Sequence, residues 1–168
     1  MLSLSLTQAF VRPLYHWRTS RPHDYADSVL NCAADDNARF TAGPRNGAPL
    51  LNIRLAEDAY LFDRLGASFY LLCFTDSDCI PTDVIEQVQA IRSNGVRLEI
   101  IAIAQNAQAS INGADQLIDD TNGHMAAKYG ITGNGAYLVR PDQHICARWL
   151  QLSAAQLHTA VDTALGKH

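Results

Sequence analysis

The sequence lacks features that define several large classes of proteins. It has no apolar run approaching the roughly 20 residues that a membrane-spanning helix needs. It has no basic excess either, because 13 Lys and Arg residues are scattered among 17 Asp and Glu residues, for a net charge of -4. Nucleic-acid-binding proteins gather basic residues on one face. We therefore expect no membrane partner and no nucleic-acid partner.

Cysteine is also scarce, with four residues in a chain of 168. Cys32, Cys73, Cys79 and Cys146 are widely spaced and do not form the dense pattern of a secreted disulfide-rich domain. The apolar start Met1–Leu6 lacks the basic region and the small-residue cleavage site of a signal peptide. These absences predict a cytoplasmic protein.

What is present divides the chain into three parts. Residues 1–31 are predicted to form a helical appendage. Residues 32–49 are rich in Asp, Asn, Gly and Pro and predict a linker of low structure. Residues 50–168 carry most of the remaining apolar runs. Since 48% of the whole chain is hydrophobic, we expect this third part to be one compact domain.

The appendage has an apolar stripe at helical spacing, which Pro13 is expected to kink or split. Full burial of such side chains gains about 1.5–3 kcal/mol each, so the stripe favours association. We expect it to lie in or near the interface of a homodimer. The stripe consists of Leu2, Leu6, Phe10, Leu14 and Trp17.

The periodicity of residues 50–168 predicts alternating strands and helices. The expected strands are Leu50–Leu55, Phe69–Phe74, Val96–Ile103, Gly135–Val139 and His144–Trp149. The expected helices are Ala59–Leu65, one that Thr82 or Asp83 caps and Asn94-Gly95 ends, His124–Tyr129, and one that Ser153 caps with Leu157, Val161 and Leu165 facing inward. Residues 105–123 give no clear prediction.

This element order predicts an α/β fold with a mixed sheet. Strand and helix alternate through the first half, and a hairpin with the turn Pro141-Asp142-Gln143 precedes the last helix. A βαβ unit followed by ββα places helices on both faces of the sheet. The arrangement is thioredoxin-like.

A thioredoxin-like fold makes thiol chemistry the first hypothesis to examine. Redox members carry C-x-x-C between the first buried strand and the next helix, whose N-terminus favours the thiolate. Here Cys73 and Cys79 are six residues apart, and Cys73 lies within the expected strand. Asp76 and Asp78 would oppose thiolate formation by charge repulsion.

Two further redox requirements are unmet. A peroxide-reducing site needs P-x-x-x-T-x-x-C, but Thr75 stands four residues before Cys79 and no proline precedes it at the required offset. The cis-proline that precedes the hairpin in thioredoxins would fall at Gly135. We therefore predict no disulfide-reductase activity, and Cys79 and Cys73 remain the candidates for an alternative thiol oxidoreductase or peroxidase.

No other constellation in the sequence predicts catalysis or metal binding. The six histidines show no metal-ligand spacing with Cys or carboxylates. Asp119-Asp120 is interpreted as a solvated loop, and Cys32 and Cys146 as small buried or half-buried hydrophobes. Thr132–Gly135 is too short to cradle a phosphate, and it precedes a strand.

Several motifs, taken in order, resemble one family. Leu61–Gly66 followed by Phe69–Phe74 is similar to "LFDLLG-x-x-F-x-LL-x-F". Tyr129-Gly130, then Tyr137–Asp142 and Arg148-Trp149, are similar to "YG…LVRPDG-x-x-x-WR". Both motifs resemble the C-terminal thioredoxin-like domain of FAD-dependent aromatic-ring hydroxylases, of the phenol hydroxylase and 3-(3-hydroxyphenyl)propionate hydroxylase kind.

The resemblance extends over nearly the whole chain. Gly43–Pro49 is similar to the "GPRPGxRAP" linker that enters that domain, and Tyr25–Asn31 to the "YxxSxLN" that ends the preceding flavin and substrate domain. Gln143 stands where the family has the glycine of its "PDG" turn. The glycine-rich turn and the Asp-Gly and Gly-Asp motifs that hold FAD in the family are missing here.

The resemblance implies a non-catalytic accessory domain that supports stability and subunit contact. It implies FAD only in a full-length relative or a flavoprotein partner, and no cofactor in this chain. The chain is then either a C-terminal piece or the product of a short gene. A third hypothesis is a free-standing module that binds another protein through its N-terminal helix.

Overall fold

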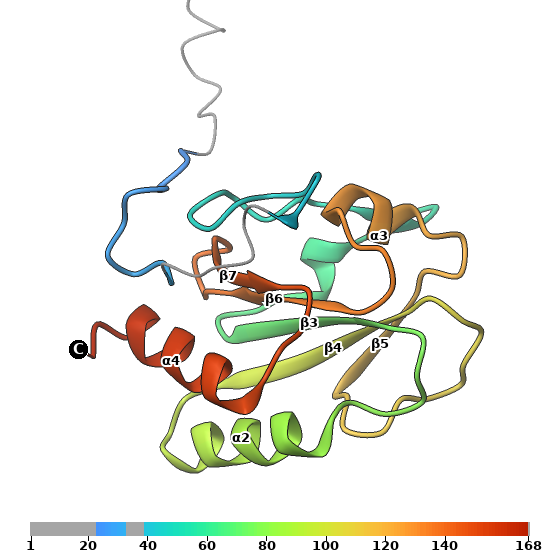
Figure 1. Cartoon of the computed structure of the whole chain (residues 1–168). Helices are drawn as coiled ribbons and strands as arrows, with labels where there is room; N and C mark the ends of the chain where they lie inside the picture. The colour runs from blue at the N-terminus through green and yellow to red at the C-terminus, as the bar shows by residue number, and fades with distance from the viewer. Residues whose placement is uncertain (1–22, 33–38, 168) are drawn as a thin grey trace, which may run out of the picture.

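One mixed five-stranded sheet organises the protein. The computed structural model describes residues 23–32 and 39–167. The strands lie in the order β5-β4-β3-β6-β7 (Figure 1), with β3, β4 and β5 parallel and with β6 antiparallel to both β3 and β7. Their bounds are β3 Phe69–Thr75, β4 Leu98–Ala104, β5 Gln116–Asp119, β6 Gly135–Val139 and β7 Ile145–Trp149.

Helices cover both faces of this sheet, as expected. Helices α2 (Thr82–Ser93) and α4 (Ala154–Ala164) pack against each other on one face. The short helix α3 (His124–Tyr129) lies on the opposite face, as Figure 1 shows. Each face carries its own hydrophobic cluster. The mixed α/β architecture is therefore confirmed.

The central strand β3 is apolar except at its last residue, Thr75. All seven of its residues are buried. Leu71 and Cys73 point into the cluster beneath α2 and α4, whereas Leu72 and Phe74 point into the cluster beneath α3. A strand between two helical layers is apolar along nearly its whole length, because neither of its faces contacts water.

Local sequence signals placed several boundaries correctly. Helix α3 and strand β6 have the expected bounds. Ser153 caps α4, since its Oγ accepts the Gln156 N–H and its own N–H donates to Gln156 Oε1. Helix α2 ends at Ser93, with Asn94 as its C-cap, followed by Gly95 with a φ of +83°. Short-range hydrogen bonds and left-handed glycines fix these ends without tertiary help.

Two predictions at the start of the domain are wrong. Residues 50–53 are not strand; β1 covers only Arg54–Ala56 and pairs with β2, Ala59–Tyr60, in a separate two-stranded sheet. The expected helix Ala59–Leu65 is instead β2 followed by a 3-10 helix, Leu61–Arg64. Leu61, the first residue of the 3-10 helix, donates its N–H to Ile53 O at 2.8 Å. Its N–H therefore bonds to the preceding segment and not within a helix.

The predicted N-cap of α2 and the predicted inward face of α4 are also wrong. Pro81, and neither Thr82 nor Asp83, occupies the N-cap position of α2. Asp83 instead accepts the N–H of Ala154 at 3.4 Å, at the start of α4. Leu165 was expected to face inward, but α4 ends at Ala164 and Leu165 is 39% exposed.

The stretch that gave no prediction, residues 105–123, contains β5. This strand is only four residues long and lies at the sheet edge, where it pairs with β4 alone. Edge strands need only one apolar face, so their sequence signal is weak.

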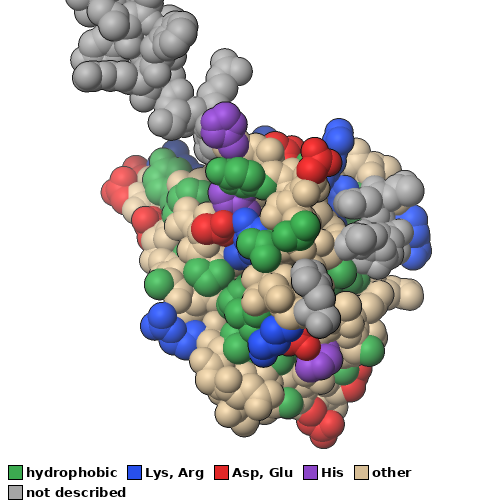
Figure 2. Space-filling view, turned by 90° about the vertical axis from the view of Figure 1, so that its left-hand side faces the viewer, with side chains coloured by type: hydrophobic (Ala, Val, Ile, Leu, Met, Phe, Trp, Pro, Cys, Tyr) green, Lys and Arg blue, Asp and Glu red, His purple; other side chains and the backbone are tan. Residues whose placement is uncertain are grey.

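The predicted N-terminal helix and its stripe of Leu6, Phe10, Leu14 and Trp17 lie outside the described residues. Residues 23–32, which are described, form turns. No helix among the described residues is long and apolar enough to cross a membrane. On the face shown in Figure 2, basic and acidic side chains are interspersed, and hydrophobic side chains are scattered among them.

Candidate functional site

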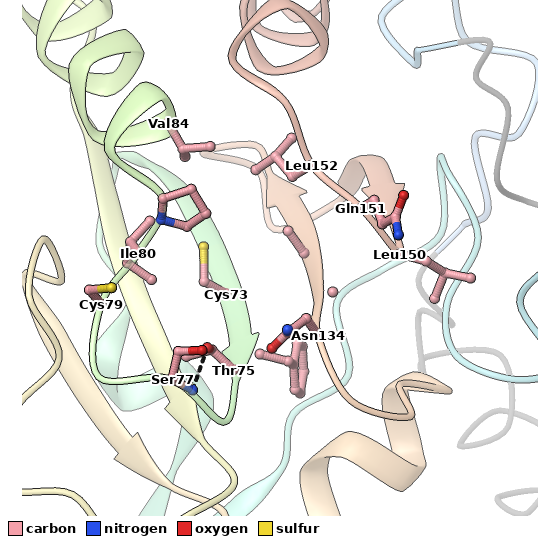
Figure 3. A pocket seen from close by; sticks show the side chains of 14 residues that line it. Cys73, Thr75, Ser77, Cys79, Ile80, Val84, Asn134, Leu150, Gln151 and Leu152 are labelled. Carbon is pink, nitrogen blue, oxygen red and sulfur yellow. Dashed lines mark hydrogen bonds between the residues drawn. The ribbon is translucent and has the colours of Figure 1, made fainter.

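A cavity of about 250 Å³ lies at the carboxyl end of β3, where the chain enters the loop before α2. In thioredoxin-like folds this is the place of the reactive thiol. The end of β3, the loop before α2, the start of β6 and the residues after β7 all contribute to its wall (Figure 3). Its polar side chains are Thr75, Ser77, Asn134 and Gln151.

The structure brings both thiol candidates, Cys73 and Cys79, to this cavity. Cys73 lies in β3 and is 7% exposed, with neighbours Ala102 on β4 and Ala136 on β6. Burial raises the pKa of the Cys73 thiol to about 12. Cys79 is exposed, and neither residue forms a disulfide. The buried thiol is therefore protonated at neutral pH and is a poor nucleophile.

The loop between the two cysteines is held by the loop after β4, residues 105–112. Asn106 Nδ2 and Gln108 Nε2 donate to Asp76 O at 3.1 and 3.2 Å. Asn112 donates its N–H to Asp78 O at 2.8 Å and accepts the Ile80 N–H at its own carbonyl. These bonds fix Cys79 before α2 begins, with Ile80 and Pro81 between it and the first helical residue.

The cavity also lacks a partner for acid/base chemistry. Among the described residues that line it, only the two cysteines have ionisable side chains, and none is a histidine or a carboxylate. No group of three His, Cys, Asp or Glu residues within the described ranges could hold a metal ion. The described part of the wall can accept a small apolar group and offers no histidine or carboxylate base beside it.

Asp120 departs from the interpretation of Asp119-Asp120 as a solvated loop. It is 4% exposed, and its two carboxylate oxygens accept the N–H groups of Met125 and Ala126 at 2.8 and 2.7 Å. These are free donors of the first turn of α3. Asp120 is thus a buried helix cap. Asp119 is exposed, and the hydrogen bonds from Thr121 lower its pKa.

Arg148, the first residue of the expected closing motif, is a buried charge. It is 4% exposed, and its Nη1 donates to the carbonyls of Ala42, Gly43 and Pro44 at 3.1–3.3 Å. Its guanidinium lies over the Phe40 ring, 4.3 Å from the centroid. Arg148 therefore holds residues 40–44 against β7. An arginine within an apolar strand indicates a buried polar contact, but the sequence does not identify its partners.

The hairpin tip also proves structural. Arg140 is 6% exposed, and its Nε and Nη2 donate to the two carboxylate oxygens of Asp142 at 3.1 and 2.6 Å. Burial alone would raise the pKa of Asp142, but the hydrogen bond and charge of Arg140, with the His144 N–H, hold it below the usual value. Gln143 donates its N–H to Arg140 O at 2.9 Å and closes the turn.

Replacing Gln143 with glycine should raise the free energy of unfolding by about 0.5–1 kcal/mol. The reason is its φ of +62°, which no other described non-glycine residue shares and which glycine adopts without steric cost. Urea unfolding measures the change. Gln151→Gly is the control, because Gln151 is exposed and lacks a positive φ. A decrease in stability for Gln143→Gly would contradict this account of the turn.

Comparisons with protein families and with curated proteins find no match. Solved structures do match. RebC soaked with K252c is 25% identical over 84% of this chain, with a TM-score of 0.54. Substrate-free RebC, described as a rebeccamycin biosynthetic enzyme, matches 98% of this chain at 20% identity and a TM-score of 0.56. Aklavinone-11 hydroxylase, in a complex with FAD and aklavinone, matches 83% at 22% identity and 0.54.

In these enzymes the matched region is a minor part. This chain spans only 22%, 27% and 25% of their respective lengths. By contrast, it spans 96% of the reduced 2-Cys peroxiredoxin of Plasmodium vivax, at 12% identity and a TM-score of 0.55 over 72% of this chain. The fold is therefore that of one thioredoxin-like unit, which also occurs as a region of these larger enzymes.

Proposed function

We propose that the chain serves as the non-catalytic, thioredoxin-like accessory domain of a flavin-dependent aromatic hydroxylase. One observation carries the proposal: 83–98% of the chain matches about a quarter of RebC and of aklavinone-11 hydroxylase. The motifs that resemble the family fall on elements of this shared unit. They include the 3-10 helix before β3 and the hairpin of β6 and β7.

The roles of the motif residues support an accessory function. Arg148 holds residues 40–44 on the sheet, and Arg140 and Asp142 build the hairpin tip. Tyr129 and Tyr137 form a buried pair, in which Tyr137 Oη donates to Tyr129 O at 2.5 Å. All of these contacts connect parts of the domain to one another. They stabilise an architecture, and none presents a reactive group to the cavity at Cys73.

The proposal assigns no cofactor to this chain and FAD to a full-length relative or a flavoprotein partner. The experiment is to raise an antibody against the chain and to purify the antigen from the organism that encodes it. Antigen that carries or accompanies FAD, released on denaturation and identified by its fluorescence, supports the proposal. An antigen of 18.4 kDa that releases no flavin at any stage contradicts it.

A thiol oxidoreductase or peroxidase is the second candidate function, because both cysteines line one cavity and the fold matches a peroxiredoxin. We expect the purified chain to lack this activity. Burial raises the pKa of the Cys73 thiol to about 12, so Cys73 stays protonated at pH 8. The rates of peroxide and insulin-disulfide reduction should not differ between the wild type and Cys79→Ser. A tenfold or larger loss in Cys79→Ser would instead favour the redox function.

Subunit contact completes the proposal. The stripe of Leu6, Phe10, Leu14 and Trp17 is proposed to pair with its copy in a homodimer, or to pack on a flavoprotein domain. Both arrangements stay predictions, because the stripe lies outside the described residues. The cytoplasmic location is likewise a prediction.

A further inference from the structure

The segment His23–Cys32 is attached to the outer edge of the last hairpin. Tyr25 donates its N–H to Gly47 O at 2.9 Å, and Cys32 donates its N–H to Cys146 O at 3.0 Å. Asn46 Nδ2 in turn donates to Cys32 O at 2.8 Å. The segment lies at the side of the molecule that carries α4 (Figure 1), and its last residue is held at the edge of β7.

These bonds place two cysteines next to each other. Cys146 lies in β7 and is fully buried in the cluster beneath α2 and α4, against which Cys32 packs from outside. The Cys146 thiol donates to Leu30 O at 3.2 Å, two residues before Cys32. Burial raises the pKa of Cys146 to about 11; the Cys32 N–H lowers it, and the nearby Cys32 thiol raises it.

The backbone geometry suits a covalent bridge. The Cys32 N–H donates to Cys146 O at 3.0 Å, which brings the two backbones into direct contact. Disulfides span Cα separations of about 4.4–6.8 Å, provided that both side chains point to the same side. Both cysteines pack against the same hydrophobic cluster, and the Cys146 thiol donates to Leu30 O at 3.2 Å, on the segment that ends at Cys32.

We propose that Cys32 and Cys146 form a redox-sensitive latch, in which a disulfide locks the segment His23–Cys32 to β7. The proposal is independent of the accessory-domain function. It gives these two cysteines, first interpreted as small hydrophobes, a chemical role. It also leaves Cys73 and Cys79 out of the reaction, because Cys73 points to the cavity at the far end of the central strand.

The oxidant is a low-molecular-weight disulfide such as oxidised glutathione. The half-buried Cys32 reacts first: its thiolate attacks one glutathione sulfur, forms a mixed disulfide and releases one glutathione thiolate. The Cys146 thiolate then attacks the Cys32 sulfur and releases the second. Two thiols lose two electrons, the glutathione disulfide gains them, and the two protons end on the two released glutathiones. Reduced glutathione or dithiothreitol reverses the reaction.

The experiment treats the intact chain with oxidised glutathione under native conditions and maps its disulfides by mass spectrometry. We expect a Cys32–Cys146 linked peptide that dithiothreitol removes, and a rise in Tm of about 5–10 °C for the oxidised protein. Trypsin gives a second readout, because Arg39 is exposed. After cleavage there, the N-terminal fragment should stay attached on a non-reducing gel and separate on a reducing one.

Matched variants make the result specific. Cys32→Ser should abolish the linked peptide and the rise in Tm, with little change in the reduced protein because Cys32 is only half-buried. Cys79→Ser should leave both unchanged. Three results would overturn the latch: a Cys73–Cys79 disulfide in place of the expected one, a Cys32 that stops at the mixed disulfide, or chains linked only through the exposed Cys79.

Discussion

Replacing Arg148 with methionine should lower the free energy of unfolding by about 3–4 kcal/mol. Methionine fills much of the same volume but cannot donate a hydrogen bond. The carbonyls of Ala42, Gly43 and Pro44 would lose the cation that they share, and the Phe40 ring would lose its guanidinium. Urea unfolding followed by circular dichroism measures the loss.

Two control variants accompany this prediction: one separates the lost hydrogen bonds from the lost charge, and the other removes an exposed arginine. Arg148→Lys keeps the positive charge but offers one compact donor group, so it should recover only part of the loss. Arg97→Met removes an exposed arginine just before β4 and should change stability by less than about 0.5 kcal/mol. If Arg148→Met cost no more than Arg97→Met, Arg148 would not be what holds residues 40–44 to the sheet.

Asp120→Ala is expected to have the second largest effect, a loss of about 3 kcal/mol. Both carboxylate oxygens of Asp120 accept buried N–H groups from the first turn of α3, and alanine leaves the two donors without an acceptor. Asp120→Asn retains one oxygen and should lose roughly half as much. Helix α3 should open first, so hydrogen exchange at Met125 and Ala126 should accelerate before global unfolding.

The neighbouring aspartate provides the matched control for this prediction. Asp119 is exposed and accepts its hydrogen bonds from Thr121 within the same turn. Asp119→Ala should therefore leave the urea midpoint close to that of the wild type. Equal losses at the two positions would mean that general charge near the helix start matters, and not the buried cap.

Local signals in the sequence determined the parts of the fold that short-range physics fixes. The apolar run at β3 predicted a strand buried on both faces, and Ser153 and Asn94-Gly95 predicted two helix ends. The turn Pro141–Gln143 predicted the hairpin. Each signal depends on residues at most a few positions apart, so no distant partner had to be known.

Tertiary structure alone decided the remaining features. Asp120 is a buried cap and not a solvated residue: its hydrogen-bond partners Met125 and Ala126 are near in sequence, but its burial depends on how α3 packs on the sheet. Asp83 contacts α4 instead of capping its own helix. Cys32 lies beside Cys146 only because the segment His23–Cys32 bonds to the edge of β7, which is distant in the sequence. The sequence shows which donors, acceptors and thiols are present. Which of them come into contact depends on how the chain closes its long loops, and residue spacing alone does not determine those contacts.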